Sequence, residues 1–197
     1  MADSRADFAR AISRVLSNDE PIALEASETA AVAIIFGRDV GREELLLIRR
    51  SERENDPWSG QIALPGGRAE KGDGSFRDTA VRETREEVGM DLEAEARFLG
   101  YLGSFQARTR SIWVVPSVFI SDRLPTVSPN IEVASARWVP FEEFIAPASR
   151  STYHVKRGAE SRAIPAFKIE DYLIWGLTER IISAMVEALR QRKPDTS

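Results

Sequence analysis

Hydrophobic and polar positions divide this chain into runs that predict strands separated by turns. The first run, residues 29–36 (TAAVAIIF), is apolar and β-branched, which is typical of a buried strand. Proline and glycine residues between the apolar runs predict turns and irregular backbone. Further strands are predicted at residues 44–48, 61–64, 98–105, 112–120 and 133–139.

Helical spacing of apolar residues occurs near both ends of the chain. At the N-terminus, Ser4 is the expected N-cap of a helix whose apolar positions are Phe8, Ile12, Val15 and Leu16. The last helix is expected from about Asp171 to Arg192, with one apolar face that contains Ile174, Leu177, Ile181 and Met185. Strands on both sides of a central helix, followed by this long helix, predict an α+β fold in which helices cover a mixed sheet.

Composition restricts the classes of protein that the sequence fits. A chain of 197 residues, 43% hydrophobic and 29% charged, fits a single globular domain over 1–197. It has no cysteine, which excludes disulfides, thiolate catalysis and cysteine-ligated metal sites. The net charge of −4 argues against a nucleic-acid partner. Without a signal peptide at 1–10 or a long apolar run, we expect a cytoplasmic protein that does not associate with a membrane.

The central helix carries the residues that suggest chemistry. It is expected over 75–88, with Ser75 in capping-box spacing and Gly89 after its end. Glu83, Glu86 and Glu87 lie at i, i+3 and i+4, so they share one stripe of the helix. Their mutual repulsion would be removed by a hard cation such as Mg²⁺ or Mn²⁺. The alternative is a solvated, Glu-rich surface.

Neighbouring residues fit a metal site better than a solvated helix. Arg82 precedes Glu86 by four residues and can orient its carboxylate, while Gly66 and Gly67 let the backbone approach the helix closely. The face that packs the helix onto the protein is expected to contain Phe76, Ala80, Thr84 and Val88.

Residues 64–90 resemble the Nudix box, G-x5-E-x7-R-E-U-x-E-E-x-G-U, in which U is bulky and apolar. The matching positions, within about 67–90, are Gly67, Arg82, Glu83, Glu86, Glu87, Gly89 and Met90. In two departures, Asp73 replaces the first glutamate with one extra residue before Arg82, and Thr84 replaces an apolar residue.

The resemblance implies an α/β/α sandwich in which Glu83, Glu86, Glu87 and the carbonyl of Gly67 hold Mg²⁺ or Mn²⁺ around a substrate diphosphate. Glu86 and Glu87, with Arg82 beside them, would then support attack of a water on phosphorus. Glu132 is the candidate for a further ligand or general base, and a surface acid is the alternative.

The flanks resemble the coenzyme A pyrophosphatase subgroup, which implies coenzyme A or a derivative as substrate. Arg50-Ser51 and Gly60 match its upstream motif, residues 174–178 (IWGLT) match its last helix, and Leu64 departs from a phenylalanine. ADP-ribose, NADH, dinucleoside polyphosphates and modified nucleoside triphosphates remain alternative substrates. RNA cap hydrolysis and a non-catalytic nucleotide-binding module are further alternatives.

Several other residues have two interpretations. Arg50 and Arg108 are candidate substrate-binding residues, although loop arginines such as Arg108 and Arg110 are often only solvated. Trp58 can stack on a base or cap the core, and a lone His154 cannot form a histidine-based metal site. The core tryptophans are expected to be Trp113, Trp138 and Trp175. Apolar terminal helices suggest a homodimer.

Overall fold

The computed structural model describes residues 3–21, 28–54, 58–107, 112–157 and 160–191. Most of its strands belong to one sheet, which is mixed because β1 and β7 run parallel while the other pairs are antiparallel. The strands of this sheet are β1 (Glu28–Asp39), β2 (Arg42–Arg50), β3 (Ile62–Ala63), β4 (Gly66–Arg68), β5 (Arg97–Tyr101), β6 (Phe105–Gln106), β7 (Ile112–Ile120) and β8 (Val133–Pro140).

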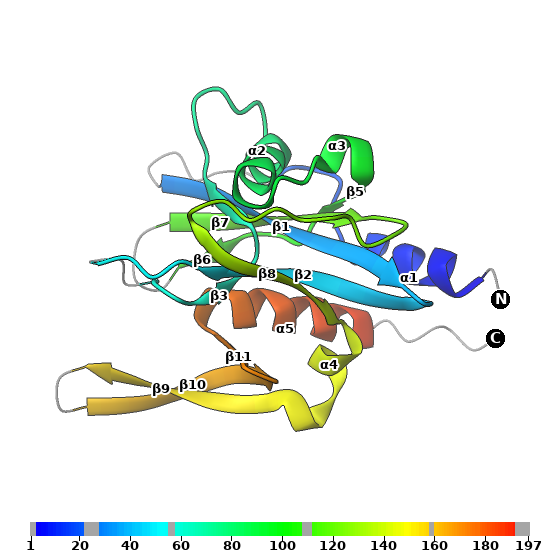
Figure 1. Ribbon diagram of the computed structural model, residues 1–197. Coiled ribbons are helices and arrows are strands. Elements are labelled where there is room, and N and C mark those ends of the chain that lie inside the picture. The colour runs from blue at the N-terminus through cyan, green and yellow to red at the C-terminus, as the bar shows by residue number, and fades with distance from the viewer. Residues whose placement is uncertain (1–2, 22–27, 55–57, 108–111, 158–159, 192–197) are drawn as a thin grey trace.

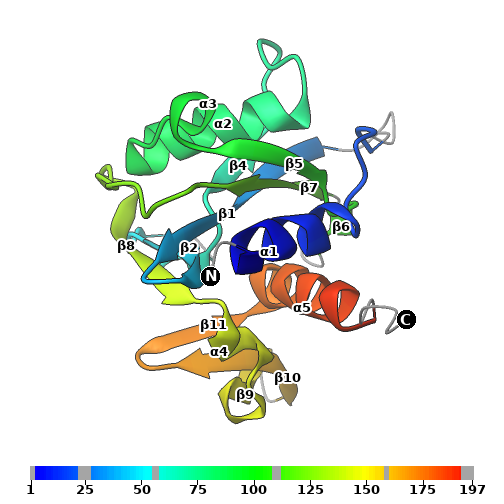
Figure 2. The ribbon, with the colours of Figure 1, turned by 90° about the vertical axis from the view of Figure 1, so that its right-hand side faces the viewer.

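Helices cover both faces of this sheet (Figures 1 and 2). The helices α2 (Phe76–Val88) and α3 (Leu92–Glu95) lie on one face, and α1 (Asp3–Ser13) and α5 (Gly176–Gln191) lie on the other. The expected α/β/α sandwich is therefore confirmed. The short helix α4 (Glu142–Ile145) and a 3₁₀ turn at Pro147–Ser149 come after β8 in the chain and lie near α5.

The alternation of side chains along β1 and β2 builds a separate hydrophobic core on each face of the sheet. Ala31, Ala33 and Ile35 pack beneath α2, whereas Ile34 and Phe36 pack toward α1 and α5. In β2 the even positions Leu46 and Ile48 face α2, and the odd positions Leu45 and Leu47 face α5. Because both faces are buried, these strands read as continuous apolar runs in the sequence.

The short strands β3 and β4 lie where β1 and β2 separate from each other, beside helix α2. The strand β1 pairs with β2 only over residues 36–39, and at residues 30–32 it pairs with β4 instead. The strand β3 pairs with β2 at residues 48–49. The segment 62–68 therefore lies between the splayed ends of β1 and β2, where Gly66 contacts Glu87 in the last turn of α2.

A second, three-stranded sheet was not predicted. It consists of β9 (Arg150–Arg157), β10 (Glu160–Ile169) and β11 (Tyr172–Trp175), in the order β11-β10-β9. It lies on the α5 side of the molecule (Figure 2). The expected start of the last helix near Asp171 is wrong, because residues 172–175 pair with β10 and α5 begins at Gly176.

Two further local expectations are corrected by the structure. Ser4 lies inside α1, which begins at Asp3, so Ser4 is not the N-cap. The run 98–105 is not one strand, because β5 and β6 are separated by residues 102–104, where Gly103 has a φ of +97°. Within the described part of the chain, no helix is long and apolar enough to cross a membrane.

Candidate active site

Helix α2 has well-defined ends, which fixes its rotation over the sheet. The Ser75 side chain accepts a hydrogen bond from the Asp78 N–H at 3.1 Å, and Gly89 ends the helix with a left-handed φ of +68°. Both ends match the expected ones. The expected packing residues Phe76, Ala80, Thr84 and Val88 are buried, together with Thr79 and Glu87.

The three glutamates of α2 lie at three different depths. The side chain of Glu86 is 57% exposed, that of Glu83 is 16% exposed, and Glu87 is 4% exposed as a residue. Burial raises the pKa of Glu83, and the charge of Glu86 raises it further. The stripe of carboxylates thus runs from solvent into the protein, which sequence spacing alone did not show.

Glu87 is a buried carboxyl group held by the loop before the helix. The Gly66 N–H donates to Glu87 Oε2 at 2.9 Å. Burial raises the pKa of Glu87 to about 7, since only this hydrogen bond and the charge of Arg50 oppose the desolvation. The nearby charges of Glu83 and Glu132 also raise the pKa. Such a group would gain from a bound cation.

Arg82 connects the acids of α2 with the preceding loop. Its Nη1 donates to Glu83 Oε1 at 2.8 Å and to Glu86 Oε2 at 3.4 Å, so the expected pairing with Glu86 is confirmed. Its strongest partner is Asp73, which accepts from Nε at 3.1 Å and from Nη2 at 3.0 Å. The Arg68 carbonyl also accepts from Nη2, at 2.9 Å. Arg82 therefore positions the carboxylates of Glu83 and Glu86 and is itself held by that of Asp73.

The two glycines before α2 are required by close contacts. A Cβ on Gly66 would overlap the Ala31 carbonyl oxygen, and a Cβ on Gly67 would overlap the Glu83 carboxylate. Gly67 pairs with Ala31 of β1, so the backbone at this point is fixed by the sheet. The glycine pair thus brings peptide groups into contact with the acids, as the sequence suggested.

Arg50 and Glu132 approach Glu87 from the end of β2 and the start of β8. The charge of Arg50 lowers the pKa of Glu87, and that of Glu132 raises it. The Ser51 N–H donates to the Glu132 carbonyl at 2.9 Å, and Arg53 Nη2 lies 3.1 Å from Glu132 Oε1. The contact of Arg53 with Glu132 could not be predicted from the sequence, because a loop arginine has no distinguishing pattern. Arg108 and Arg110 lie outside the described residues.

The sequence profile of the NUDIX domain matches residues 27–157, about two thirds of the chain. The chain belongs to the Nudix hydrolase family. Its box helix is α2, on which Arg82 contacts the box glutamates Glu83 and Glu86, and the Gly66 N–H contacts the third, Glu87.

Two named relatives of this Nudix protein show how far the similarity extends. It is 30% identical to "Peroxisomal coenzyme A diphosphatase ndx-8" of Caenorhabditis elegans, over 98% of this chain and 81% of that protein. It is 31% identical to "Nudix hydrolase 22, chloroplastic" of Arabidopsis thaliana, over 88% of this chain and 59% of that protein. The chain thus spans little more than half of the length of the Arabidopsis relative.

Solved structures show the same fold at low sequence identity. The MutT protein from Methanosarcina mazei Go1 has a TM-score of 0.54 and 23% identity, and the match covers 87% of this chain and 100% of that chain. An ADP-ribose pyrophosphatase from Streptococcus suis has a TM-score of 0.52 and 18% identity, with coverage of 85% and 96%. These matches confirm the Nudix fold.

Family membership implies a divalent cation, and the box residues have the chemistry to bind one. Among the described residues, no three acidic or histidine side chains already converge as a metal-binding cluster. Instead, Glu83 and Glu86 both accept from Nη1 of Arg82, and burial raises the pKa of Glu87, which accepts from the Gly66 N–H. Oxygen ligands with unbalanced negative charge suit Mg²⁺ or Mn²⁺.

Proposed function

We propose that this Nudix protein hydrolyses a diphosphate bond in a nucleoside-diphosphate-linked small molecule, with coenzyme A or a derivative as the preferred substrate. The observation that carries the proposal is the set of three glutamates at graded depth, positioned by Arg82 and by the Gly66 N–H. The relative named as a coenzyme A diphosphatase, aligned over 98% of this chain, supports the substrate class.

Glu83, Glu86, Glu87 and the Gly67 carbonyl would hold Mg²⁺ or Mn²⁺. The cation, when bound, neutralises the diphosphate and lowers the pKa of a bound water. Arg82 keeps Glu83 and Glu86 oriented through one nitrogen, Nη1, which limits the rotation of both carboxylates. The Gly66 N–H fixes Oε2 of Glu87 at 2.9 Å, so Oε1 would be the oxygen that binds the cation.

Two groups at the ends of β2 and β8 complete the proposed site. Arg50, whose charge acts on Glu87, would bind a substrate phosphate as the diphosphate enters. Glu132 remains the proposed general base: its side chain is 48% exposed, and Arg53 holds it at 3.1 Å. The ion pair with Arg53 would hold the Glu132 carboxylate in place to accept a proton from the attacking water.

The test is product analysis by mass spectrometry with Mg²⁺ or Mn²⁺ and a panel of substrates. The panel contains coenzyme A, ADP-ribose, NADH, diadenosine polyphosphates and nucleoside triphosphates. Rapid release of an adenosine bisphosphate and 4′-phosphopantetheine from coenzyme A is the expected result. Preference for another substrate would retain the diphosphatase activity and reject coenzyme A, while no cleavage would favour a nucleotide-binding module.

Variants of the acids separate chemistry from folding. Glu86→Gln should abolish turnover and leave the fold intact, because the Glu86 side chain is mostly exposed. The matched control is Glu187→Gln on α5, an exposed glutamate on a different helix, which should retain activity. Full activity of Glu86→Gln would reject the assignment of the metal site.

Assembly and location rest on the sequence. We propose a homodimer from the apolar terminal helices, and a mass near 22.0 kDa by light scattering would reject it. A cytoplasmic location is proposed from the sequence alone. The names of the two relatives do not support it, because they refer to the peroxisome and the chloroplast.

A further inference from the structure

A cavity of about 320 Å³ lies on the face of the main sheet opposite to α2. Its walls come from the end of β2, the loop before β3, and the second sheet, and they include Arg49, Ser59, Gln61, Tyr153, Leu173 and Trp175. This volume is at the lower end of the range for ligand pockets, which is about 300–1,000 Å³. The cavity therefore suits one ring-sized part of a ligand.

The second sheet contributes an aromatic wall to this cavity. Tyr153 of β9 and Trp175 of β11 stack with ring centroids 4.3 Å apart and an interplanar angle of 15°. Alternation along β11 buries Tyr172 and Ile174 on one side and leaves Trp175 half-exposed on the cavity side. Trp175 was expected in the core, and its place at a cavity wall is a correction.

Polar groups complete the opposite wall. Ser59 Oγ accepts a hydrogen bond from the Arg53 N–H at 2.7 Å, which fixes the loop at the rim. Arg49 Nη2 lies 2.7 Å from Asp171 Oδ2, so the cavity has charge next to its stacked rings. Gln61 adds an amide that has both donor and acceptor groups. A flat ring with polar edges can stack on the aromatic wall and form hydrogen bonds with the polar wall.

The cavity is close to the acids of α2 along the chain. Arg49 faces the cavity, whereas the next residue, Arg50, acts on the charge of Glu87. Gln61 is five residues before Gly66, which binds Glu87, so the two points are separated by at most about 18 Å of extended chain. This upper limit is consistent with one elongated substrate that extends around the end of β2 from the acids to the cavity.

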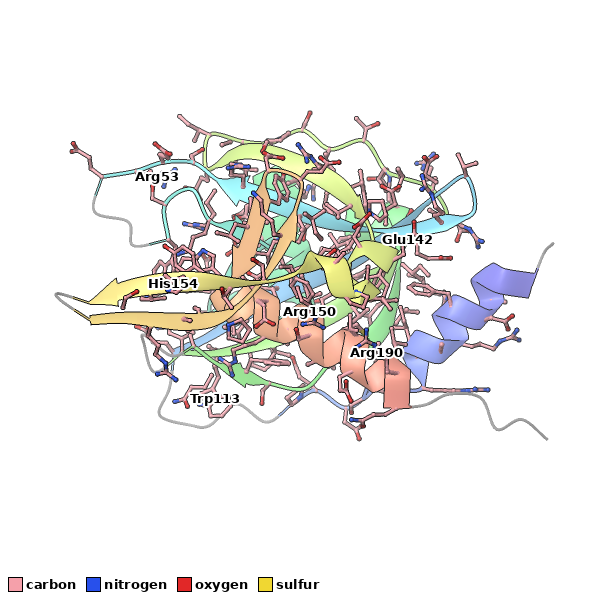
Figure 3. All side chains as sticks on the ribbon, turned by 90° about the horizontal axis from the view of Figure 1, so that it is seen from below. Arg53, Trp113, Glu142, Arg150, His154 and Arg190 are labelled. Atoms are coloured by element: carbon pink, nitrogen blue, oxygen red, sulfur yellow. The ribbon has the colours of Figure 1, made fainter. Side chains whose placement is uncertain are left out.

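We propose that this cavity binds the nucleobase of the substrate, stacked on the Tyr153–Trp175 pair, while the diphosphate lies at the acids of α2. The inference rests on the proposed function, because it assigns a position to the base of that substrate. Figure 3 shows His154 on the hairpin and Arg53 on the loop after β2 at the same end of the molecule. In this proposal, the second sheet provides the aromatic surface on which the base stacks.

Calorimetric titration of the intact protein without metal tests the inference separately from hydrolysis. Adenosine 5′-monophosphate is expected to bind at least about tenfold more tightly than ribose 5-phosphate, which lacks the base. Trp175→Leu and Tyr153→Leu should each weaken adenosine 5′-monophosphate binding by about tenfold and leave ribose 5-phosphate unchanged. His154→Leu is the matched control, because His154 is exposed and adjacent to Tyr153 on the other side of β9.

A conservative variant covers the case in which a leucine variant does not fold. Trp175→Phe keeps a ring, so it should bind adenosine 5′-monophosphate nearly as well as the wild type but lose most of the ligand-induced quenching of tryptophan fluorescence. Full quenching in Trp175→Phe, or equal binding of the two probes by the wild type, would overturn the proposal. Base-dependent binding without turnover would instead reject the proposed hydrolysis and retain the cavity.

Discussion

Replacing Asp73 by asparagine should destabilise the fold more than its position in a surface loop suggests. The Asp73 side chain is only 9% exposed, and it accepts four hydrogen bonds. Two come from Arg82, one from the Thr79 hydroxyl at 2.8 Å, and one from the Glu70 N–H at 2.9 Å. An asparagine of the same shape loses the charge and places an NH₂ group opposite one of these donors.

The magnitude follows from the pKa of the Asp73 carboxyl group. Its hydrogen bonds with Arg82 lower this pKa from 3.8 to about 2. One pKa unit corresponds to about 1.4 kcal/mol, so the ionised form contributes about 2 kcal/mol to the free energy of unfolding. For a protein of this size, a loss of about 2 kcal/mol lowers Tm by about 4–8 °C.

The assay is urea unfolding followed by tryptophan fluorescence, with Asp7→Asn as the control. The Asp7–Arg10 pair is shorter, at 2.6 Å, but its side chains are 61% and 59% exposed. Screening by water should limit the effect of Asp7→Asn to about 0.5 kcal/mol or less. The two pairs thus separate burial from distance as the cause of the stabilisation.

The pH dependence gives a second test of the same ion pair. Because the folded pKa of Asp73 is lowered, its contribution is fully present above pH 3.8 and is lost as the pH falls toward about 2. The stability difference between wild type and Asp73→Asn should therefore shrink over this window. A difference below about 0.5 kcal/mol at neutral pH, or one equal to that of Asp7→Asn, would refute the reasoning.

Three other predictions concern the acids and the glycine loop. In chelator-treated protein, Glu87→Gln should become more stable than wild type as the pH rises from 4.5 to about 7, because the raised pKa of Glu87 disfavours its ionised form. Urea titrations at several pH values measure this difference in stability, and a difference that does not change with pH contradicts the prediction. Gly67→Ala should reduce kcat at least about tenfold by displacing Glu83. Gly72→Ala should not, because a Cβ at this position meets open space; equal kcat values would contradict this. If Glu132 is the base, Glu132→Gln should lower kcat by about 10²-fold or more with little change in KM, and an unchanged pH–rate profile would exclude that role.

Most of the box helix could be predicted from the sequence, because its determinants are local. The Ser75 cap, the Gly89 terminus and the spacing of Glu83, Glu86 and Glu87 depend on residues within one or two helical turns. The buried strands were also predictable, since both faces of the main sheet are covered and their residues are apolar throughout.

The second sheet could not be predicted in the same way. Residues 172–175 have apolar spacing that continues into α5, so they fit a helix until their pairing with β10 is known. That pairing joins positions such as Ala166 and Trp175 through a turn at Glu170, which has a φ of +50°. The place of Trp175 at the cavity wall followed from this pairing.

The sequence by itself determined the fold class, the box helix and the identity of the three acids, because residue type and helical period decide these features. Only the tertiary structure decided that Glu87 is buried against Gly66, that Asp73 is the main partner of Arg82, and that Arg49 and Arg50 serve opposite faces of β2. The reason is that burial and electrostatic environment come from segments distant in sequence, and the positions of those segments are fixed only when the sheet forms.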